Sequence, residues 1–315
     1  MSILIERKHT LSMKKIIVIC GPTGIGKTSF AISIARRFNG EIIGADSMQI
    51  YKHLDIGTAK PDIEELKQAP HHLVNYIDPK DDFDAGKYVK AADKIIEDIS
   101  ARGKIPIIAG GTGLYIRALL HGLFRSKPIC KQTISQLTRE LEENGTAQLY
   151  QKLKNSDPAA AEKIHPNDSF RVIRALEVCQ TSAQKISDQQ KQHNFKNLRY
   201  NYVKIGLTME RGKLYERINQ RVDEMLDRGL LNEVKTLGRN GYSFDLKPMQ
   251  SIGYKHMAMF LNKDLDWEES VRLFKRDSRR YAKRQYTWFN KDKDMNWLKP
   301  SQFNDAEKLI KEFLT

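Results

Sequence analysis

The sequence predicts an α/β fold, in which a parallel sheet is flanked by helices and interrupted by an inserted all-helical domain. A glycine-rich loop at residues 21–28 separates an apolar run from a helical pattern. Further apolar runs at 42–43, 105–109 and 202–207 alternate with helical patterns, which is typical of parallel sheets. Residues 124–201 are instead polar, helical in pattern and free of strong strand signals.

The glycine-rich loop has the sequence and the setting of a P-loop. The run before it, KIIVIC at 15–20, is apolar and β-branched like a buried strand, and a helical pattern follows at 29–37. In a P-loop, backbone N–H groups and the helix N-terminus hold phosphate, a lysine reaches the outer phosphates and a hydroxyl holds Mg²⁺. We therefore expect a P-loop NTPase-like fold. A di- or triphosphate would be held by Gly21, Pro22, Thr23, Gly24, Ile25, Gly26, Lys27 and Thr28, with Thr28 as the ligand of Mg²⁺.

Asp46 follows the second predicted strand, and α/β sheets bind their ligands outside the carboxyl ends of their strands. Asp46 is therefore expected near the P-loop, as a helix N-cap, as a ligand of Mg²⁺ or as a general base. Residues 51–61 form a polar loop that is long for a connector, so we expect this loop to line the site.

The alternation of strands and helices continues after this loop. The His71-His72 pair has no partner at metal-ligand spacing and is interpreted as structural or surface, with an edge strand or extended segment at 73–77. A helix is expected at 83–99, and the strand after it runs into Gly110-Gly111-Thr112. Glycines at a strand-to-helix turn indicate backbone close to a ligand. Kinases of this fold often have a metal-binding aspartate here, so its absence argues against them.

The pattern divides the chain into three segments: the first part of the core at 14–123, the helical insertion at 124–201, and the rest of the core with basic C-terminal helices at 202–315. Within the insertion we expect two helices divided at residues 144–145. A further helix at 170–178 would be capped by Asp168 or Ser169.

The chain is strongly basic, with 53 Lys and Arg against 39 Asp and Glu, a formal charge of +14 and a pI of about 9.5. Such an excess favours a nucleic-acid partner, because phosphate contacts supply most sequence-independent affinity, whereas general solubility is the alternative. Basic residues at three- and four-residue spacing predict a cationic stripe made of Arg272, Lys275, Arg276, Arg279, Arg280, Lys283 and Arg284. A solvated helix face and a contact with the phosphate backbone both remain open for this stripe.

Other features favour the cytoplasm and give no sign of a membrane partner. No run approaches the roughly 20 apolar residues that span a bilayer, and residues 1–12, with one short apolar patch, are expected to be an N-terminal extension. Cys20, Cys130 and Cys179 lie far apart without zinc-site spacing, which fits a reducing compartment. Because no heptad or large apolar stripe calls for a partner subunit, we expect a monomer.

Five segments in this order make the chain resemble the tRNA dimethylallyltransferase family, in its bacterial form. They are GPTGIGKT at 21–28, DSMQIYKHLDIGTAKP at 46–61, GGTGLYIRALL at 110–120, HPNDSFRVIRALEV at 165–178 and AKRQYTWF at 282–289. The similarity extends over about residues 14–297. Ala183 replaces an expected glycine, and Gln250 and Lys255 replace expected arginines, so these positions affect only the details of tRNA contact.

The resemblance implies transfer of a dimethylallyl group from dimethylallyl diphosphate to the exocyclic amine of adenosine at position 37 of tRNA. The P-loop would hold a diphosphate leaving group with Mg²⁺ as cofactor, and no nucleotide would be hydrolysed. Asp46 would be the base, and Thr112 and Arg221 would lie at the diphosphate; the residues alone do not favour Arg221 over Arg217. The resemblance places tRNA contacts at Asp46, Ser47, Met48, Gln49, Phe170, Arg171, Val172, Ile173, Arg174, Gln250, Ser251, Ile252, Gly253, Tyr254 and Lys255. The insertion and the cationic stripe would then hold the anticodon stem-loop by shape and phosphate contacts.

Three alternatives are weighed against this function. A P-loop kinase for a nucleoside or small metabolite would use ATP and leaves the basic excess unexplained. An adenylate isopentenyltransferase would use a free nucleotide, which the insertion and the charge disfavour. A non-enzymatic RNA-binding module is disfavoured by the P-loop together with Asp46.

Overall fold

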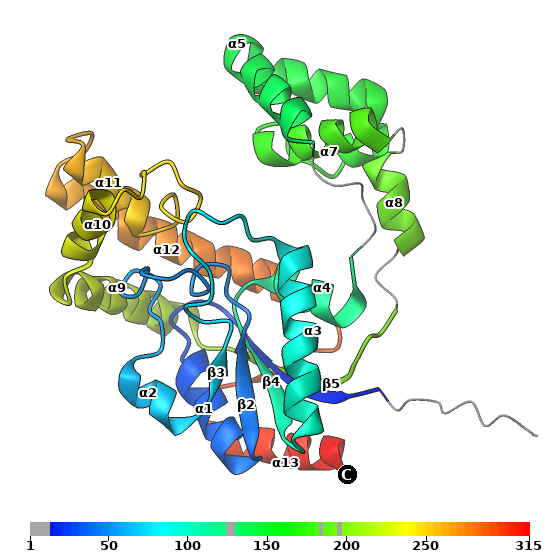
Figure 1. The fold of residues 1–315 in the computed structure, drawn as a ribbon, viewed down its shortest axis with the longest axis vertical. Coiled ribbons are helices and arrows are strands. Elements are labelled where there is room, and N and C mark those ends of the chain that lie inside the picture. Colours follow the sequence, from blue (N-terminus) through cyan, green and yellow to red (C-terminus); the bar gives the residue numbers. More distant parts are fainter. Residues whose placement is uncertain (1–12, 124–129, 183–184, 194–196) are drawn as a thin grey trace, which may run out of the picture. The chain divides into compact units, whose positions relative to one another are not determined.

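The computed structural model describes residues 13–123, 130–182, 185–193 and 197–315 (Figure 1). The chain forms two compact units. The core unit combines the chain up to Leu120 with Leu198–Thr315, and the helical unit is His121–Asn197. The expected insertion at 124–201 covers most of the helical unit. The expected extension at 1–12 and the departure at Ala183 lie outside the described residues.

The core unit is built on a six-stranded sheet whose neighbouring strands all pair in parallel. The strands are β1 (Lys15–Cys20), β2 (Gly40–Gly44), β3 (His71–His72), β4 (Ile105–Gly110), β5 (Asn201–Leu207) and β6 (Asn296–Leu298), in the order β3-β2-β4-β1-β5-β6. This sheet confirms the predicted α/β class. The edge strand lies at the histidine pair and not at 73–77, where Ile77 makes only an isolated bridge to Tyr51.

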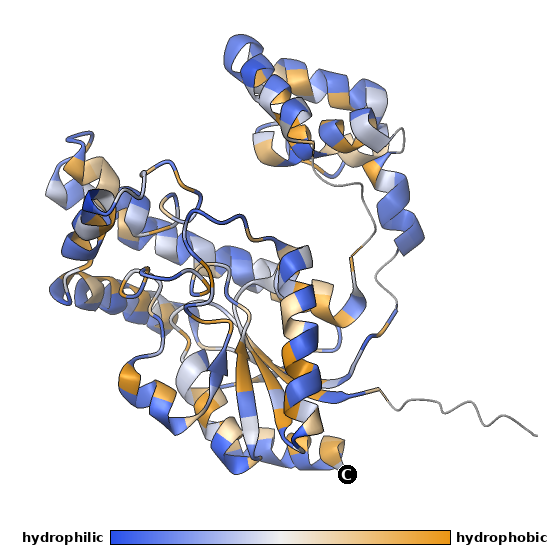
Figure 2. Ribbon diagram, viewed as in Figure 1, coloured by the Kyte–Doolittle hydropathy of each residue, from blue (hydrophilic) through white to orange (hydrophobic). Residues whose placement is uncertain are grey.

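Both faces of the sheet are buried by helices, as a parallel sheet requires. Side chains alternate along a strand, so Ile16 and Val18 of β1 pack on one face and Ile17 and Ile19 on the other. Figure 2 shows the strands as the most hydrophobic part of the core unit. The nine helices described in this unit are α1 (Lys27–Arg37), α2 (Ile63–Gln68), α3 (Ala85–Ala101), α4 (Gly113–His121), α9 (Arg211–Asp227), α10 (Leu230–Arg239), α11 (Tyr254–Leu261), α12 (Trp267–Phe289) and α13 (Phe303–Leu314).

Two differences from the expected elements have local causes. Helix α1 begins at Lys27 and not at residue 29, because Gly26 adopts a left-handed conformation (φ 97°) and acts as its N-cap. Short elements such as α2 and β6 were not predicted, because six and three residues are too few to show a period. Within the described residues, no helix combines the length and apolarity needed to cross a membrane.

The helical unit contains α5 (Lys131–Ser156), α6 (Pro158–Ala161), α7 (Ser169–Ser182) and α8 (Ile186–His193). Gly145 is non-helical (φ 76°, ψ 168°), so it divides α5 at the place that the sequence predicts. Asp168 Oδ1 accepts a hydrogen bond from Arg171 N at 3.1 Å, which identifies Asp168 as the cap of α7. This unit has an apolar core of its own, built around Leu137, Leu153 and Val172.

Candidate functional site

The P-loop connects β1 to the N-terminus of α1 and leaves backbone donors free. Among the described residues, the N–H groups of Gly26, Lys27 and Thr28 have no hydrogen-bond acceptor. They therefore form an anion site at the positive end of the helix dipole. Thr23 N is instead occupied, because it donates to Gln285 Oε1 of α12 at 2.8 Å.

The ammonium group of Lys27 is held inside the P-loop. Its Nζ donates to Pro22 O at 2.7 Å. Burial lowers the pKa of Lys27 to about 8, although the charge of Asp46 acts in the opposite direction. A phosphate group bound in the loop would place negative charge beside the ammonium of Lys27 and so raise its pKa again.

Asp46 follows β2 and is held by the backbone that comes after it. Its Oδ1 accepts from Met48 N at 2.8 Å and from Gln49 N at 3.2 Å. Within the described residues its Oδ2 has no hydrogen-bond partner, so one carboxylate oxygen is fixed and the other is available. Residues 47–50 form a turn and not a helix, so Asp46 caps this turn and is not the helix N-cap that was one of its expected roles; the role of general base stays a prediction.

Thr112, which follows β4, supports the turn that carries Asp46. Its Oγ1 accepts from Ser47 N at 3.0 Å, and its own N–H donates to Ala45 O at 3.0 Å. Its side chain does not line either of the two cavities at the site. The expected contact of Thr112 with diphosphate stays a prediction.

Arg221 connects the P-loop to the surroundings of Asp46. From α9 its Nη1 donates to Thr23 Oγ1 at 3.2 Å. Burial lowers the pKa of Arg221, and the charge of Asp46 partly offsets this effect. Arg217, one turn earlier on α9, is exposed and donates no hydrogen bond to the P-loop within the described residues.

Two cavities adjoin the site. The P-loop cavity, about 290 Å³, is lined by Thr23, Gly24, Gly26, Lys27 and Thr28 of the P-loop, by Arg217 of α9 and by Arg228, which follows α9. The apolar cavity, about 320 Å³, has walls that include Ile218, Val222, Met225, Ile252 and Phe274. Both are lined by Thr23, Asp46, Thr58 and Arg221. A molecule in one cavity can therefore face a molecule in the other across Asp46 and Arg221.

The loop at 51–61 lines the site, as its length predicts. Gly57 and Thr58 form part of the apolar cavity, and residues 58–61 form part of the P-loop cavity. Gln49 ties this loop to the turn after β2, because its Nε2 donates to Thr58 O at 3.1 Å and to Ala59 O at 2.9 Å.

The first and third expected tRNA-contact segments meet at the apolar cavity. Its lining includes Ser47 and Met48 from the first, and Gln250, Ser251 and Ile252 from the third. The second segment lies in the helical unit, where Phe170 is 81% exposed. Arg171 is also exposed and pairs with Asp168 at 3.2 Å, whereas Arg174 is less exposed and pairs with Glu177.

Two residues of these segments are corrected by the structure. Val172 and Tyr254 are fully buried, so they pack inside the protein and cannot touch RNA directly. Val172 faces the core of the helical unit, as its place in an amphipathic helix requires. In the P-loop, Ile25 is likewise buried and contributes only its backbone position.

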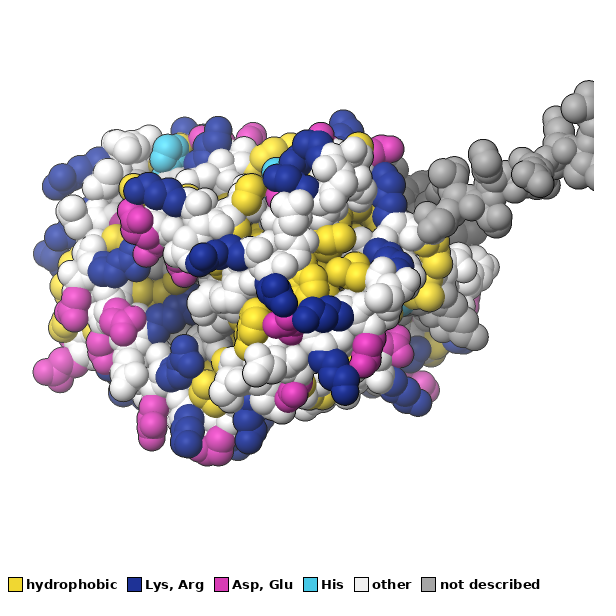
Figure 3. Space-filling view, turned by 90° about the horizontal axis from the view of Figure 1, so that it is seen from below, with side chains coloured by type: hydrophobic (Ala, Val, Ile, Leu, Met, Phe, Trp, Pro, Cys, Tyr) yellow, Lys and Arg dark blue, Asp and Glu magenta, His cyan; other side chains and the backbone are white. Residues whose placement is uncertain are grey.

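The cationic stripe on α12 is partly neutralised within the protein. Lys275 pairs with Asp223 at 2.6 Å, Arg272 with Glu269 and Arg276 with Asp277. Lys283 is exposed and has no ion pair among the described residues. On the face drawn in Figure 3, Lys and Arg are interspersed with Asp and Glu, so the basic excess does not form one patch there. Solvated face and phosphate contact stay open as interpretations of this stripe.

Sequence reasoning did not assign roles to two residues of α12. Gln285 donates to Gly111 O at 2.9 Å while accepting from the P-loop, so it joins the loops after β1 and β4. Tyr281 lines the apolar cavity, and burial raises its pKa. Gln285 lies within AKRQYTWF at 282–289, one of the five segments by which the chain resembles its family, and its two hydrogen bonds give this segment a structural role.

The fold and the site define an α/β P-loop protein whose loop opens beside a second, apolar cavity. The chain belongs to the IPP transferase family, whose model matches residues 49–292. Two curated relatives, both called tRNA dimethylallyltransferase, come from Desulfosudis oleivorans and Acetivibrio thermocellus. The first is 48% identical over 303 residues (95% of this chain, 96% of the relative), and the second is 47% identical over 300 residues (95% and 96%).

Solved structures agree with this assignment. The tRNA isopentenylpyrophosphate transferase of Bacillus halodurans matches with a TM-score of 0.70 and 39% identity, over 96% of this chain and 97% of that protein. A eukaryotic dimethylallyltransferase described as acting on tRNA matches with a TM-score of 0.77 and 31% identity, over 95% of this chain and 77% of that protein.

Proposed function

We propose that this protein transfers a dimethylallyl group from dimethylallyl diphosphate to the exocyclic amine of adenosine at position 37 of tRNA. The observation that carries the proposal is the pair of cavities that meet at Asp46 and Arg221, in a chain of the IPP transferase family. The P-loop cavity suits the diphosphate. The apolar cavity suits the adenine ring and the allyl chain.

In the proposed reaction the adenine amine attacks the first carbon of the allyl group. A carbon–nitrogen bond forms there while the bond from that carbon to the diphosphate oxygen breaks, and the electron pair leaves with the diphosphate. The free Oδ2 of Asp46 accepts the proton that the amine loses. The backbone bonds to Oδ1 fix the orientation of the carboxylate, as a general base requires.

The residues around the P-loop stabilise the charge that grows on the departing diphosphate. Lys27 and the backbone N–H groups reach its outer oxygens, and Arg221 lies where the bridging oxygen would face Asp46. The hydroxyl of Thr28 lines the same cavity and has no hydrogen-bond partner among the described residues. One protein oxygen beside phosphate fits Mg²⁺, which keeps several waters and binds through substrate phosphates. When bound, Mg²⁺ would add positive charge beside the leaving group.

The adenine of the tRNA must leave its stack to reach Asp46. Unstacking costs a few kcal/mol, and it costs less in a loop than in a duplex. The aliphatic and aromatic walls of the apolar cavity offer the adenine a flat, dry environment. Phe170 and the exposed basic residues supply further RNA contacts in this proposal. The monomeric state and the cytoplasmic location stay predictions.

A transfer assay tests the proposal. The protein is incubated with Mg²⁺, radiolabelled dimethylallyl diphosphate and unmodified tRNA whose anticodon ends in adenosine, and label in the RNA is counted. We expect label in tRNA and none when adenosine 37 is replaced. Absence of label, together with ATP consumption on a small hydroxylated acceptor, would favour the kinase alternative.

Binding of the diphosphate donor should weaken above pH 8. The free enzyme loses the proton of Lys27 near pH 8, while the bound diphosphate stabilises the charged lysine. The apparent Kd should therefore rise about tenfold between pH 7 and pH 9. Titration calorimetry without tRNA measures this change, and the control Lys27→Arg should bind with less pH dependence because arginine stays charged. A flat profile for the unchanged protein would exclude deprotonation of Lys27.

Binding of tRNA should fall steeply with salt, by about tenfold or more between roughly 50 and 200 mM if three or more phosphates are contacted. Removing the unpaired cation in Lys283→Ala should lower the salt slope by about one contact. The matched control is Lys275→Ala, whose ammonium is already paired with Asp223. Equal effects of the two substitutions would count against the phosphate-contact interpretation of the stripe.

A further inference from the structure

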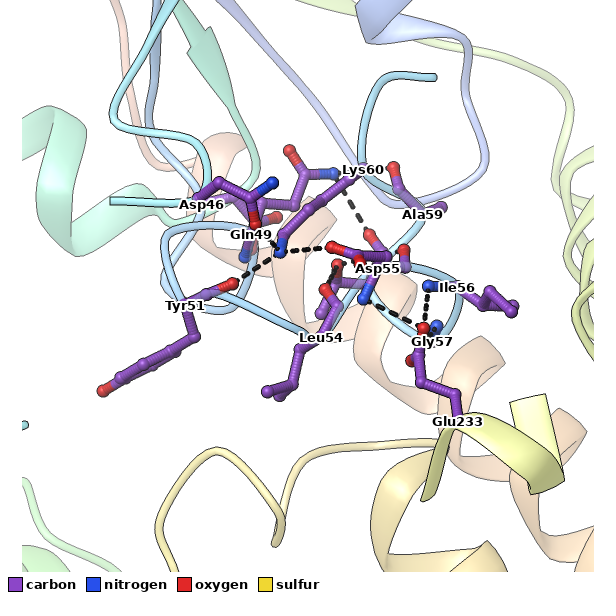
Figure 4. Close-up of polar contacts among 12 residues, drawn as sticks. Asp46, Gln49, Tyr51, Leu54, Asp55, Ile56, Gly57, Ala59, Lys60 and Glu233 are labelled. Carbon is purple, nitrogen blue, oxygen red and sulfur yellow. Dashed lines mark hydrogen bonds and ion pairs between the residues drawn. The ribbon is translucent and has the colours of Figure 1, made fainter. Parts of the chain in front are cut away.

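Glu233 of α10 binds two segments that line the apolar cavity. Its Oε2 accepts from Ile56 N at 2.8 Å and from Asp55 N at 3.2 Å. Its Oε1 accepts from the hydroxyl of Tyr254 and faces Gly57 N at 3.4 Å, a long contact. In Figure 4 the Glu233 carboxylate lies against the turn formed by residues 55–57. One side chain thus receives four donors from parts of the chain that are far apart in sequence.

Within the described residues Glu233 is one of two charged side chains that hold this turn. Lys60 is the second anchor, because it is buried and its Nζ donates to Tyr51 O at 2.5 Å and to Asp55 Oδ1 at 2.7 Å (Figure 4). In the described structure the N–H groups of Asp55 and Ile56 have Glu233 as their only acceptor, whereas Gly57 N is shared between Glu233 and the hydroxyl oxygen of Tyr254. Glu233 therefore holds the N–H side of this turn, while the carbonyl side is held within the loop by Lys60 N, which donates to Asp55 O at 3.1 Å, and by Ala59 N, which donates to Ile56 O at 3.0 Å.

Close packing makes the same turn sensitive to Tyr254. A Cβ at Gly57 would lie 2.4 Å from Tyr254 Cε2, so the backbone of the loop rests directly on the aromatic ring. Burial raises the pKa of Tyr254, so its hydroxyl stays protonated and keeps donating to Glu233. The ring of Tyr254 thus packs against the backbone of the loop at Gly57, although the resemblance placed Tyr254 among the tRNA contacts.

The supported residues belong to the reaction site. Gly57 and Thr58 line the apolar cavity beside Asp46, and Thr58 also lines the P-loop cavity. Tyr254 begins α11, directly after the turn whose residues 250–252 form another part of the apolar cavity. A shift at Glu233 would therefore move two walls of this cavity and leave the P-loop in place.

We propose that Glu233 is a positioning residue that orients the acceptor adenosine over Asp46 by holding residues 55–57 and Tyr254; this rests on the function proposed above. Glu233 touches neither the P-loop nor Asp46. Because the diphosphate of the donor would be held in the P-loop cavity, loss of Glu233 should impair the use of tRNA much more than the binding of the donor. A purely structural role would instead lower the folded fraction and leave both kinetic constants of the folded protein unchanged.

The test compares Glu233→Gln and Glu233→Ala with Glu312→Gln, an exposed glutamate of α13 without a side-chain bond among the described residues. We expect kcat/KM for tRNA to fall about tenfold in Glu233→Gln and about a hundredfold in Glu233→Ala, since small misplacements cost that much. The KM for dimethylallyl diphosphate should stay within about twofold. Tyr254→Phe removes one donor of four and should lose about threefold.

Hydrogen exchange of the amides of residues 55–57 provides a readout that does not need activity. Exchange should be faster in Glu233→Gln than in the unchanged protein and unaltered in Glu312→Gln. The proposal is overturned if folded Glu233→Gln keeps kcat/KM for tRNA within twofold of the control, or if the KM for the donor rises to the same extent. If the unchanged protein labels no tRNA, the proposed function fails, and unaltered exchange in Glu233→Gln would separately reject the anchoring role.

Discussion

Replacing Asp46 by asparagine should lower the rate of transfer by about 10²–10⁴-fold, the usual contribution of a general base, and leave tRNA binding nearly intact. The physical reason lies in the two oxygens of this side chain. Oδ1 accepts the N–H groups of Met48 and Gln49, and an asparagine carbonyl can accept them as well. The second oxygen becomes an amide, which cannot take the proton of the adenine amine.

Single-turnover rates with saturating tRNA and donor measure this effect, and a filter-binding titration measures the affinity for tRNA. The control is Asp264→Asn, an exposed aspartate after α11 whose side chain has no bond within the described residues. Unchanged transfer in Asp46→Asn would remove Asp46 from the role of base. A comparable loss of tRNA affinity would mean that Asp46 acts mainly in binding.

The sequence predicts the site wherever chemistry follows directly from local spacing. The P-loop is recognisable because glycines, a lysine and a threonine occur at fixed offsets between a strand and a helix. Asp46 is predictable because it ends a strand of a parallel sheet, where ligands bind. The division of α5 at Gly145 and the cap at Asp168 depend only on backbone conformation nearby.

The parts that escaped prediction depend on contacts between distant segments. Gln285 of α12 joins the loops after β1 and β4, although it lies 262 residues from Thr23 in the sequence. In the sequence Glu233 resembles any glutamate on a helix surface, yet its carboxylate accepts a hydrogen bond from Asp55 N, 178 residues away. Tyr254 was misassigned because a motif fixes which residue is present but not which way it faces.

Replacing Arg221 by alanine should lower kcat by about 10²–10³-fold, as expected when one preorganised donor to a developing negative charge is lost. Arg221 donates to Thr23 of the P-loop and lines both cavities, so it lies where the leaving oxygen separates from the allyl carbon in the proposed reaction. Arg217 lies one helical turn earlier and lines only the P-loop cavity. It should therefore contribute to binding the donor and not to the bond-breaking step.

The comparison of Arg221→Ala with Arg217→Ala separates these roles, which the sequence alone leaves equal. We expect Arg217→Ala to raise the KM for dimethylallyl diphosphate about tenfold with kcat within about threefold, the pattern of lost uniform binding. Arg221→Ala should show the opposite pattern, because its guanidinium acts when charge moves onto the diphosphate. If both substitutions changed only the KM, the two arginines would form one binding surface, and stabilisation of the leaving group would fall to Lys27 and the backbone donors of the P-loop.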